Sequence, residues 1–270
     1  MMEFSYDKII TGGKVITVAS GKGGTGKTTA VAALSSCLAV LGYKTLCIDF
    51  DVGMRNLDLA LAMTDFAVMD FVDVATGNIE LMSAVNESPS IRNLYFLTAP
   101  PGEVSHVSDD TRDMSEHDYS IDTSMLQAMF AEVRKNFDYC LVDSPPGVGA
   151  VFKLAHCDAD TSIIVTLGEN PSIRDAEQAA ASVRDLGIDN VRLIVNRVKP
   201  ENFKRTKSTV DDIIDTIGVQ LLGLVPEDKY IFRALHSATP LILYKKRYSA
   251  YDFLDIARRI VGEAIPLRRV

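Results

Sequence analysis

The sequence predicts a doubly wound α/β fold, with a mostly parallel β-sheet flanked by helices. Short apolar runs typical of buried parallel strands alternate with segments whose apolar residues recur at helical spacing. A glycine-rich loop joins the first such run to the first helix, and two later runs end in aspartate. In open α/β sheets ligands bind at the carboxyl ends of the strands, so we expect a site there.

The predicted elements follow from the local pattern of apolar residues and from turn and cap signals. The first helix has apolar residues four or three positions apart and stops at Gly42. The helix beginning at Ser172 has this serine as its expected cap, with Asp175 three residues later. The expected strands are 15–19, 45–48, 93–98, 139–142, 162–165 and 191–195, and the expected helices are 30–41, 70–75, 124–136, 172–186 and 249–261.

Length and composition indicate one domain in a reducing compartment. The chain has 270 residues, of which 47% are hydrophobic, enough for a single α/β core. Its four cysteines lie in apolar contexts without C-x-x-C spacing, which indicates reduced thiols, and the N-terminus lacks a signal-peptide pattern. We expect a cytoplasmic protein with an extension at 1–13, the folded domain at 14–262 and a short tail at 263–270.

The loop from Gly21 to Thr29 predicts a phosphate site. Its glycines let backbone N–H groups turn toward phosphate oxygens, and the following helix adds its positive N-terminal end. Lys27 would place a charge on the outer phosphates and Thr28 a hydroxyl on Mg²⁺, whereas Lys22 taken alone would be a solvated loop lysine. The loop residues expected to contact nucleotide are Gly21, Lys22, Gly23, Gly24, Thr25, Gly26, Lys27, Thr28 and Thr29.

Aspartates at two strand ends predict a magnesium site beside this loop. Of Asp49 and Asp51, one could hold Mg²⁺ through water and the other could orient the water that attacks the γ-phosphate. Asp143 would order the water around Mg²⁺ next to the threonine. Without the loop, these aspartates would be interpreted as caps of the turns that follow.

The stretch 100–122 reads as an irregular acidic segment. A solvated loop is favoured over a metal site, because the spacing of the candidate ligands fits no tight pattern. These candidates are His106, Asp109, Asp110, Asp113, Glu116 and His117.

Lys-Gly-Gly-Thr-Gly-Lys-Thr-Thr at 22–29 resembles the deviant phosphate loop of the MinD/ParA ATPases, and the segment 48–59 is similar to the MinD branch. The resemblance implies slow ATP hydrolysis with Mg²⁺ and a switch between an ADP monomer and an ATP-sandwich dimer. It assigns Lys22 to the nucleotide of the opposite subunit, Asp51 to the attacking water and Asp49 to Mg²⁺ through water. Catalytic roles therefore fall on Lys22, Lys27 and Asp51, and metal binding on Thr28, Asp49 and Asp143.

The resemblance also extends to later segments. Asp-Ser-Pro-Pro-Gly at 143–147 is similar to the MinD switch, although Pro146 replaces the usual alanine, and Gly147 would sense the γ-phosphate through its N–H. Asn196 and Arg197 end a strand where the family contacts adenine; from the residues alone they could be turn formers. Pro226, Glu227 and Asp228 resemble the Pro-Glu-Asp segment that closes over the base, and Pro226 and Glu227 are the expected nucleotide contacts.

The tail departs from the MinD pattern. MinD proteins end in a lysine-rich amphipathic helix that docks on membrane, whereas Pro266 interrupts this tail and little apolar area follows. Peripheral binding to the inner face of the membrane therefore has weak support. A regulatory partner of the division-site or positioning type is implied, and the net charge of −8 makes DNA an unfavoured partner.

Three alternative functions stay open. A ParA-like partition or cargo-positioning ATPase would need a basic surface for DNA. A metal-cluster accessory ATPase like the nitrogenase iron protein would need a cysteine pair, and Cys140 and Cys157 do not sit at the expected positions. In a nucleotide-gated scaffold, ATP would set partner binding and hydrolysis would be incidental.

Overall fold

A computed structural model describes residues 12–52, 56–64, 69–101, 104–106, 119–199, 201, 209–244 and 248–268. Its strands are β1 (Lys14–Ala19), β2 (Thr45–Asp49), β3 (Asn86–Glu87), β4 (Leu94–Leu97), β5 (Val104–His106), β6 (Tyr119–Ile121), β7 (Tyr139–Asp143), β8 (Thr161–Leu167), β9 (Val191–Val198) and β10 (Gln220–Pro226). Its helices are α1 (Lys27–Val40), α2 (Leu57–Leu61), α3 (Phe71–Ala75), α4 (Leu81–Ala84), α5 (Thr123–Asn136), α6 (Ala150–Ala155), α7 (Asn170–Asp185), α9 (Val210–Ile217), α10 (Lys229–His236), α11 (Leu241–Tyr244) and α12 (Ser249–Ile260).

The predicted doubly wound sheet is confirmed. Eight strands form one sheet in the order β10-β9-β8-β1-β7-β2-β4-β3, and all the pairs are parallel except β3 with β4. The strand order reverses around β1, whose neighbours are β7 and β8. In such sheets the crevice at the reversal point is the usual ligand site.

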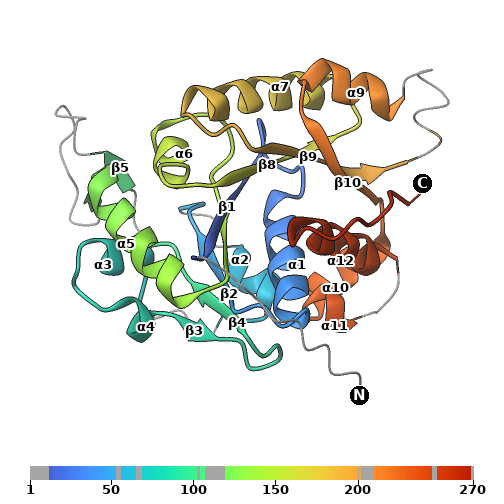
Figure 1. Cartoon of the computed structure of the whole chain (residues 1–270). Helices are drawn as coiled ribbons and strands as arrows, with labels where there is room; N and C mark the ends of the chain where they lie inside the picture. The colour runs from blue at the N-terminus through green and yellow to red at the C-terminus, as the bar shows by residue number, and fades with distance from the viewer. Residues whose placement is uncertain are drawn as a thin grey trace.

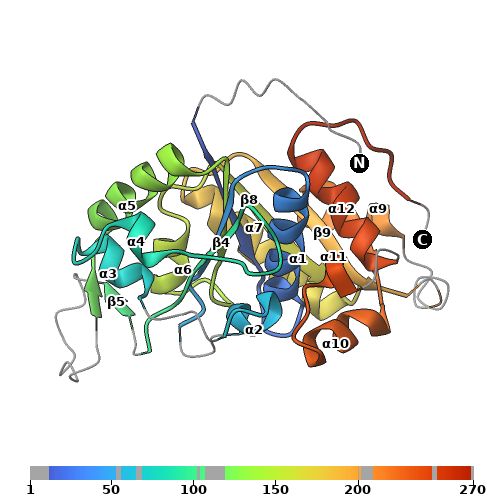
Figure 2. The ribbon, with the colours of Figure 1, turned by 90° about the horizontal axis from the view of Figure 1, so that it is seen from below.

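Helices cover both faces of the sheet (Figure 1). On one face α1, α2, α10, α11 and α12 pack against strand residues such as Val18 and Leu141. On the other face α3 to α6 pack against Val15 and Cys140, and α7 and α9 pack against Ile164. Figure 2 shows α3, α4 and α5 at one end and α10, α11 and α12 at the other. Alternation along each strand thus produces two cores, as a parallel sheet covered on both faces requires.

Parts of the sequence-based prediction are wrong. The stretch 100–122 is not wholly irregular, because β5 and β6 pair in parallel within it, and each has only three residues, too few for a period of two to be recognised. The acidic residues from Asp109 to His117 lie outside the described residues. Ser172 does not cap α7, since the helix begins at Asn170 and the Ser172 hydroxyl accepts a hydrogen bond from the Leu167 N–H at 3.1 Å.

The prediction of free cysteines is confirmed. All four thiols are unpaired, and burial raises the pKa of Cys37, Cys47 and Cys157 to about 12. These thiols therefore stay protonated and unreactive at neutral pH.

None of the described helices combines the length and apolar character needed to cross a bilayer.

The buried side chain of His156 links α6 to β8 through two hydrogen bonds. Its Nδ1 donates to the Phe152 carbonyl at 2.7 Å, so Nε2 accepts from the Ser162 hydroxyl at 3.3 Å. Burial lowers the pKa of His156 to about 4, from the ordinary value of 6.5. The imidazole is therefore neutral in the folded protein, whereas the unfolded chain takes up a proton as the pH falls below 6.5.

We predict that replacing His156 with Gln removes part of the acid sensitivity of the fold. When the pH is lowered from about 7.5 to about 5, protonation of His156 in the unfolded chain should lower the unfolding free energy of wild type by about 2 kcal/mol. The variant should not show this part of the loss. Urea titrations of both proteins at the two pH values measure this difference. Equal losses in the two proteins would show that His156 is not held neutral.

Candidate nucleotide site

The site lies at the carboxyl ends of β1, β7 and β2, which are adjacent in the sheet. In register, Asp143 pairs with Val18 of β1 on one side and with Asp49 of β2 on the other. The side chains of Asp49 and Asp143 are both buried. Two strand-end carboxylates therefore meet directly beside the loop that leaves β1.

Lys27 links the loop to these carboxylates. It is the first residue of α1, it is buried, and its ammonium forms an ion pair with Asp143. The same ammonium lies 3.6 Å from the Asp51 carboxylate. Asp49 in turn accepts a hydrogen bond from the Asp51 N–H at 2.8 Å. The structure thus brings together four of the predicted site residues, Lys27, Asp49, Asp51 and Asp143.

Burial controls the protonation of these carboxyl groups. It raises the pKa of Asp49 to about 7, and the neighbouring charge of Asp143 acts in the same direction. Burial also raises the pKa of Asp143, while the Lys27 charge and hydrogen bonds from Lys27 and Thr28 oppose this shift. A second cation at this point would stabilise both charged forms.

The residues present fit a magnesium ion. The Asp143 Oδ2 is buried and has no hydrogen-bond partner among the described residues, so one oxygen is left for a further ligand. Thr28 follows Lys27 in the first turn of α1 and carries a hydroxyl, and Asp49 pairs with Asp143 in the register of β2 and β7. Carboxylate and hydroxyl oxygens are the donors that Mg²⁺ prefers.

The loop conformation leaves the start of α1 open. Gly26 occupies the N-cap position with φ of 91° and provides no side-chain cap, so N–H groups of the first turn lack that partner. The helix begins at Lys27 and not at the predicted residue 30, which places Lys27, Thr28 and Thr29 in its first turn. Free N–H groups at a helix N-terminus bind anions readily.

Two close contacts require glycine in this loop. A Cβ at Gly21 would lie 2.1 Å from the Asp175 carbonyl oxygen, so α7 packs directly on the loop backbone. A Cβ at Gly26 would lie 2.3 Å from the Asn196 amide nitrogen, which donates to the Thr25 carbonyl at 2.8 Å. The loop is therefore fixed against α7 and β9. Gly23 and Gly24 are exposed to solvent.

Lys22 and Gly147 both form hydrogen bonds with Ser20, the residue before the loop. The Lys22 carbonyl accepts from the Ser20 hydroxyl at 2.9 Å, and within the described ranges its ammonium makes no ion pair. The Gly147 N–H donates to the Ser20 carbonyl at 3.2 Å, with φ of 85°. The predicted contact between the Gly147 N–H and a γ-phosphate would require this N–H to break its hydrogen bond with the Ser20 carbonyl.

A cavity of about 840 Å³ adjoins the loop. The residues predicted to surround the base all line it, and its volume suits a nucleoside. They are Asn196, Arg197, Pro226 and Glu227, together with Gly26 and Thr29 of the loop. Lys199 forms a partly exposed ion pair with the Glu227 carboxylate at 2.6 Å.

Sequence reasoning placed Asp228 in the segment that closes over the base but missed helix α10 and the aromatic residues of this wall. Asp228 caps α10 by accepting from the Tyr230 N–H at 2.9 Å and also accepts from the Ser249 N–H at 3.2 Å. Tyr230 stacks on Tyr248 at 5.3 Å, and Phe232 at the rim is 73% exposed. A capping aspartate before an amphipathic segment was the available signal for α10. Its contact with α12 depends on tertiary packing.

No group of three or more candidate metal ligands among His, Cys, Asp and Glu occurs within the described residues. The predicted oxygen site for Mg²⁺ would therefore use few protein ligands, with the remaining positions supplied by phosphate and water.

Residues 16–241 match the CobQ/CobB/MinD/ParA nucleotide binding domain family. The chain is 33% identical over 258 residues to the septum site-determining protein MinD of Thermotoga maritima, covering 94% of this chain and 90% of that protein.

Solved structures agree with these sequence matches. MinD in the MinC:MinD cell division complex of Aquifex aeolicus superposes with a TM-score of 0.83 at 34% identity, covering 95% of this chain and 98% of that chain. MinD of Pyrococcus horikoshii, solved with Mg-ADP, gives a TM-score of 0.76 at 27% identity, covering 92% and 96%. The chain therefore belongs to the MinD/ParA family of nucleotide-binding phosphate-loop ATPases and is of the septum site-determining MinD type.

Proposed function

We propose that this ATPase binds ATP with Mg²⁺ at the loop 21–29, alternates between an ADP-bound monomer and an ATP-sandwich dimer, and acts in division-site selection. The observation that carries the proposal is the convergence of Lys27 with three strand-end aspartates at the open N-terminus of α1. The MinD relatives support the division-site role.

The roles of the residues follow from charge placement. Lys27 would neutralise the outer phosphates, and Thr28 and Asp143, with Asp49 through water, would hold Mg²⁺. When bound, Mg²⁺ supplies positive charge that stabilises the phosphate oxygens in the transition state. Asp51 would orient the attacking water. Release of Lys27 from Asp143 toward the phosphates is favoured because a divalent ion would then compensate the carboxylate.

The base would occupy the cavity beside the loop. Asn196 and Arg197 would contact adenine from β9, and Pro226 and Glu227 would close over it. Tyr230 and Tyr248 add an aromatic wall to the same cavity. Flat aromatic faces are suited to a purine ring.

The alternatives have less support. A ParA-like DNA-binding role lacks a basic composition, since the net charge is −8. A metal-cluster role lacks a pair of accessible thiols, because Cys37, Cys47 and Cys140 are buried and Cys157 alone of the four cysteines is partly exposed. A nucleotide-gated scaffold would share this site, so measurement of turnover with and without an activator protein must separate it from the enzyme.

The proposal also covers a protein partner and the location of the protein in the cell. The Aquifex neighbour is solved as a MinC:MinD complex, and we infer that a regulator of this kind binds the present chain. We place the protein in the cytoplasm. Membrane binding through residues 263–268 has little support, because this segment is not helical and Arg259 holds the Ile265 and Pro266 carbonyls at 2.9 and 2.7 Å.

We predict that Lys22→Ala lowers ATP turnover at least about 100-fold, because the lysine would supply transition-state charge to the opposite subunit. Monomer affinity for ATP should stay within about threefold of wild type, since the lysine would not contact its own nucleotide. Steady-state phosphate release and nucleotide titration test both expectations. Lys135→Ala, a lysine on the exposed surface of α5, is the control for loss of one positive charge.

Mixing variants separates action on the partner from action on the same subunit. In a dimer of Lys22→Ala with Asp51→Ala, one site would be intact only if Lys22 acts across the interface. Equal mixing before ATP addition should then restore about a quarter of wild-type turnover. No recovery despite formation of mixed dimers would contradict the proposed role.

We predict that Asp51→Ala accumulates as a dimer with ATP, since the attacking water would lose its orienting carboxylate while binding of the nucleotide persists. Light scattering after size exclusion in ATP and in ADP measures the mass. Asp185→Ala, at an exposed position on α7, should behave like wild type. A variant that stays monomeric with saturating ATP would argue against the sandwich dimer.

A further inference from the structure

A second cavity, of about 280 Å³, lies at the opposite edge of the sheet from the phosphate loop. It is lined by residues at or near the starts of β1, β7, β8, β9 and β10 and by the end of α12. The six-residue strand β1 runs from this cavity to the loop, so the two sites are about 20 Å apart. Three cations and no carboxylate line the cavity: Lys14, Arg192 and Arg259.

None of these cations is paired with a carboxylate of the described chain. Arg192 donates to the neutral Gln220 amide at 2.5 Å. Arg259 donates to backbone carbonyls, at 3.0 Å in the case of Leu222. Lys14 makes no ion pair within the described ranges, and its side chain is exposed. In a chain with a net charge of −8, three cations without acidic partners around one cavity are unusual.

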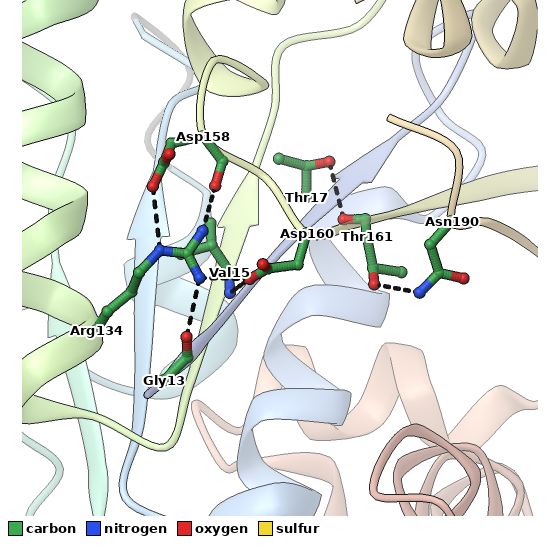
Figure 3. Close-up of polar contacts among 8 residues, drawn as sticks. All are labelled: Gly13, Val15, Thr17, Arg134, Asp158, Asp160, Thr161 and Asn190. Carbon is green, nitrogen blue, oxygen red and sulfur yellow. Dashed lines mark hydrogen bonds and ion pairs between the residues drawn. The ribbon is translucent and has the colours of Figure 1, made fainter. Parts of the chain in front are cut away.

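Three acidic side chains before β7 and β8, Asp138, Asp158 and Asp160, form hydrogen bonds or ion pairs outside the cavity. Asp160 immediately precedes β8, yet its carboxylate accepts from the Val15 N–H at 2.7 Å and from Arg134 at 2.5 Å. Arg134 also pairs with Asp158 at 3.1 Å (Figure 3). Asp138, before β7, accepts from the Lys44 N–H at 2.7 Å. None of these three carboxylates lines the cavity.

On α12, Asp255 forms an ion pair with Arg268 at 2.6 Å, and Asp252 lies 3.9 Å from the same arginine. Neither carboxylate lines the cavity.

Three neutral donors and four apolar side chains, Ile16, Ile163, Leu222 and Ile260, complete the lining. Asn190 donates one amide hydrogen to the Thr161 hydroxyl oxygen at 2.7 Å, as Figure 3 shows, and keeps a second. The Thr161 hydroxyl and the Tyr139 hydroxyl, whose pKa burial raises to about 12, are further donors at neutral pH. A guanidinium has five N–H groups, so Arg192 and Arg259 also retain unused donors.

We propose that this cavity binds the phosphoryl group of a small anion, at a site separate from that of the nucleotide. Its volume is too small for a whole nucleotide but sufficient for phosphate or a small phosphomonoester. Lys14 and Arg192 would supply charge and Arg259 would supply a fork-shaped donor held in place by the backbone carbonyls of residues 222, 265 and 266.

The test uses the full chain saturated with Mg-ADP, so that the phosphate loop is already filled. Inorganic phosphate is titrated at constant ionic strength, and backbone and arginine side-chain NMR shifts are followed. We expect saturating shifts at Lys14, Thr161, Asn190 and Arg192, with a dissociation constant on the order of 1 mM. Lys14→Gln should weaken this binding at least about fivefold, and Lys135→Gln, the same charge change on α5, less than about twofold.

A second arm identifies the source of the phosphoryl group. Sedimentation with vesicles of phosphatidic acid, against phosphatidylcholine, tests a lipid headgroup in wild type and in Lys14→Gln. Phosphate binding without vesicle binding supports a soluble ligand, and vesicle binding that depends on Lys14 supports a lipid. Absence of both, or shifts confined to the loop 21–29, would overturn the proposal. Retained ADP binding in these experiments would show that the proposed nucleotide function stands independently.

Discussion

The contact on which the site depends is the buried ion pair between Lys27 and Asp143. A buried charge is costly unless it is paired, and each partner here compensates the other. The pair also joins the first turn of α1 to the end of β7, across the crevice where the strand order reverses. Asp49 and Asp51 extend the same charge arrangement from β2. The protein thus holds a lysine and three carboxylates together at this crevice.

The two edges of the sheet have different chemistry. At the carboxyl edge, acidic side chains surround one lysine and glycines expose the backbone. At the amino edge, Arg134 forms ion pairs with Asp158 and Asp160, and backbone N–H groups donate to Asp160 and Asp138. The three cations that line the cavity there, Lys14, Arg192 and Arg259, make no ion pair with a carboxylate of the described residues. The proposed nucleotide site and the proposed phosphoryl site would thus lie at opposite edges of the sheet in a chain whose net charge is −8.

Features encoded within a few neighbouring residues could be predicted from the sequence. The apolar runs ending at Asp49 and Asp143 and the glycines before Lys27 have strong local signals, and the parallel sheet follows from their alternation with helices. The short β5 and β6 lack enough residues to show a period. The cavity wall formed by Tyr230 and Tyr248 depends on packing between α10 and α12, which no local pattern specifies.

The most direct test of the account is ATP binding measured by calorimetry, with and without Mg²⁺, in wild type and in Asp143→Asn. If Asp143 shares its charge between Lys27 and a metal, Mg²⁺ should tighten ATP binding at least about tenfold in wild type and hardly at all in the variant. Affinity without Mg²⁺ should be kept or increased in the variant, because Lys27 is released from its carboxylate. An unchanged response to Mg²⁺ in Asp143→Asn would contradict the proposed metal site.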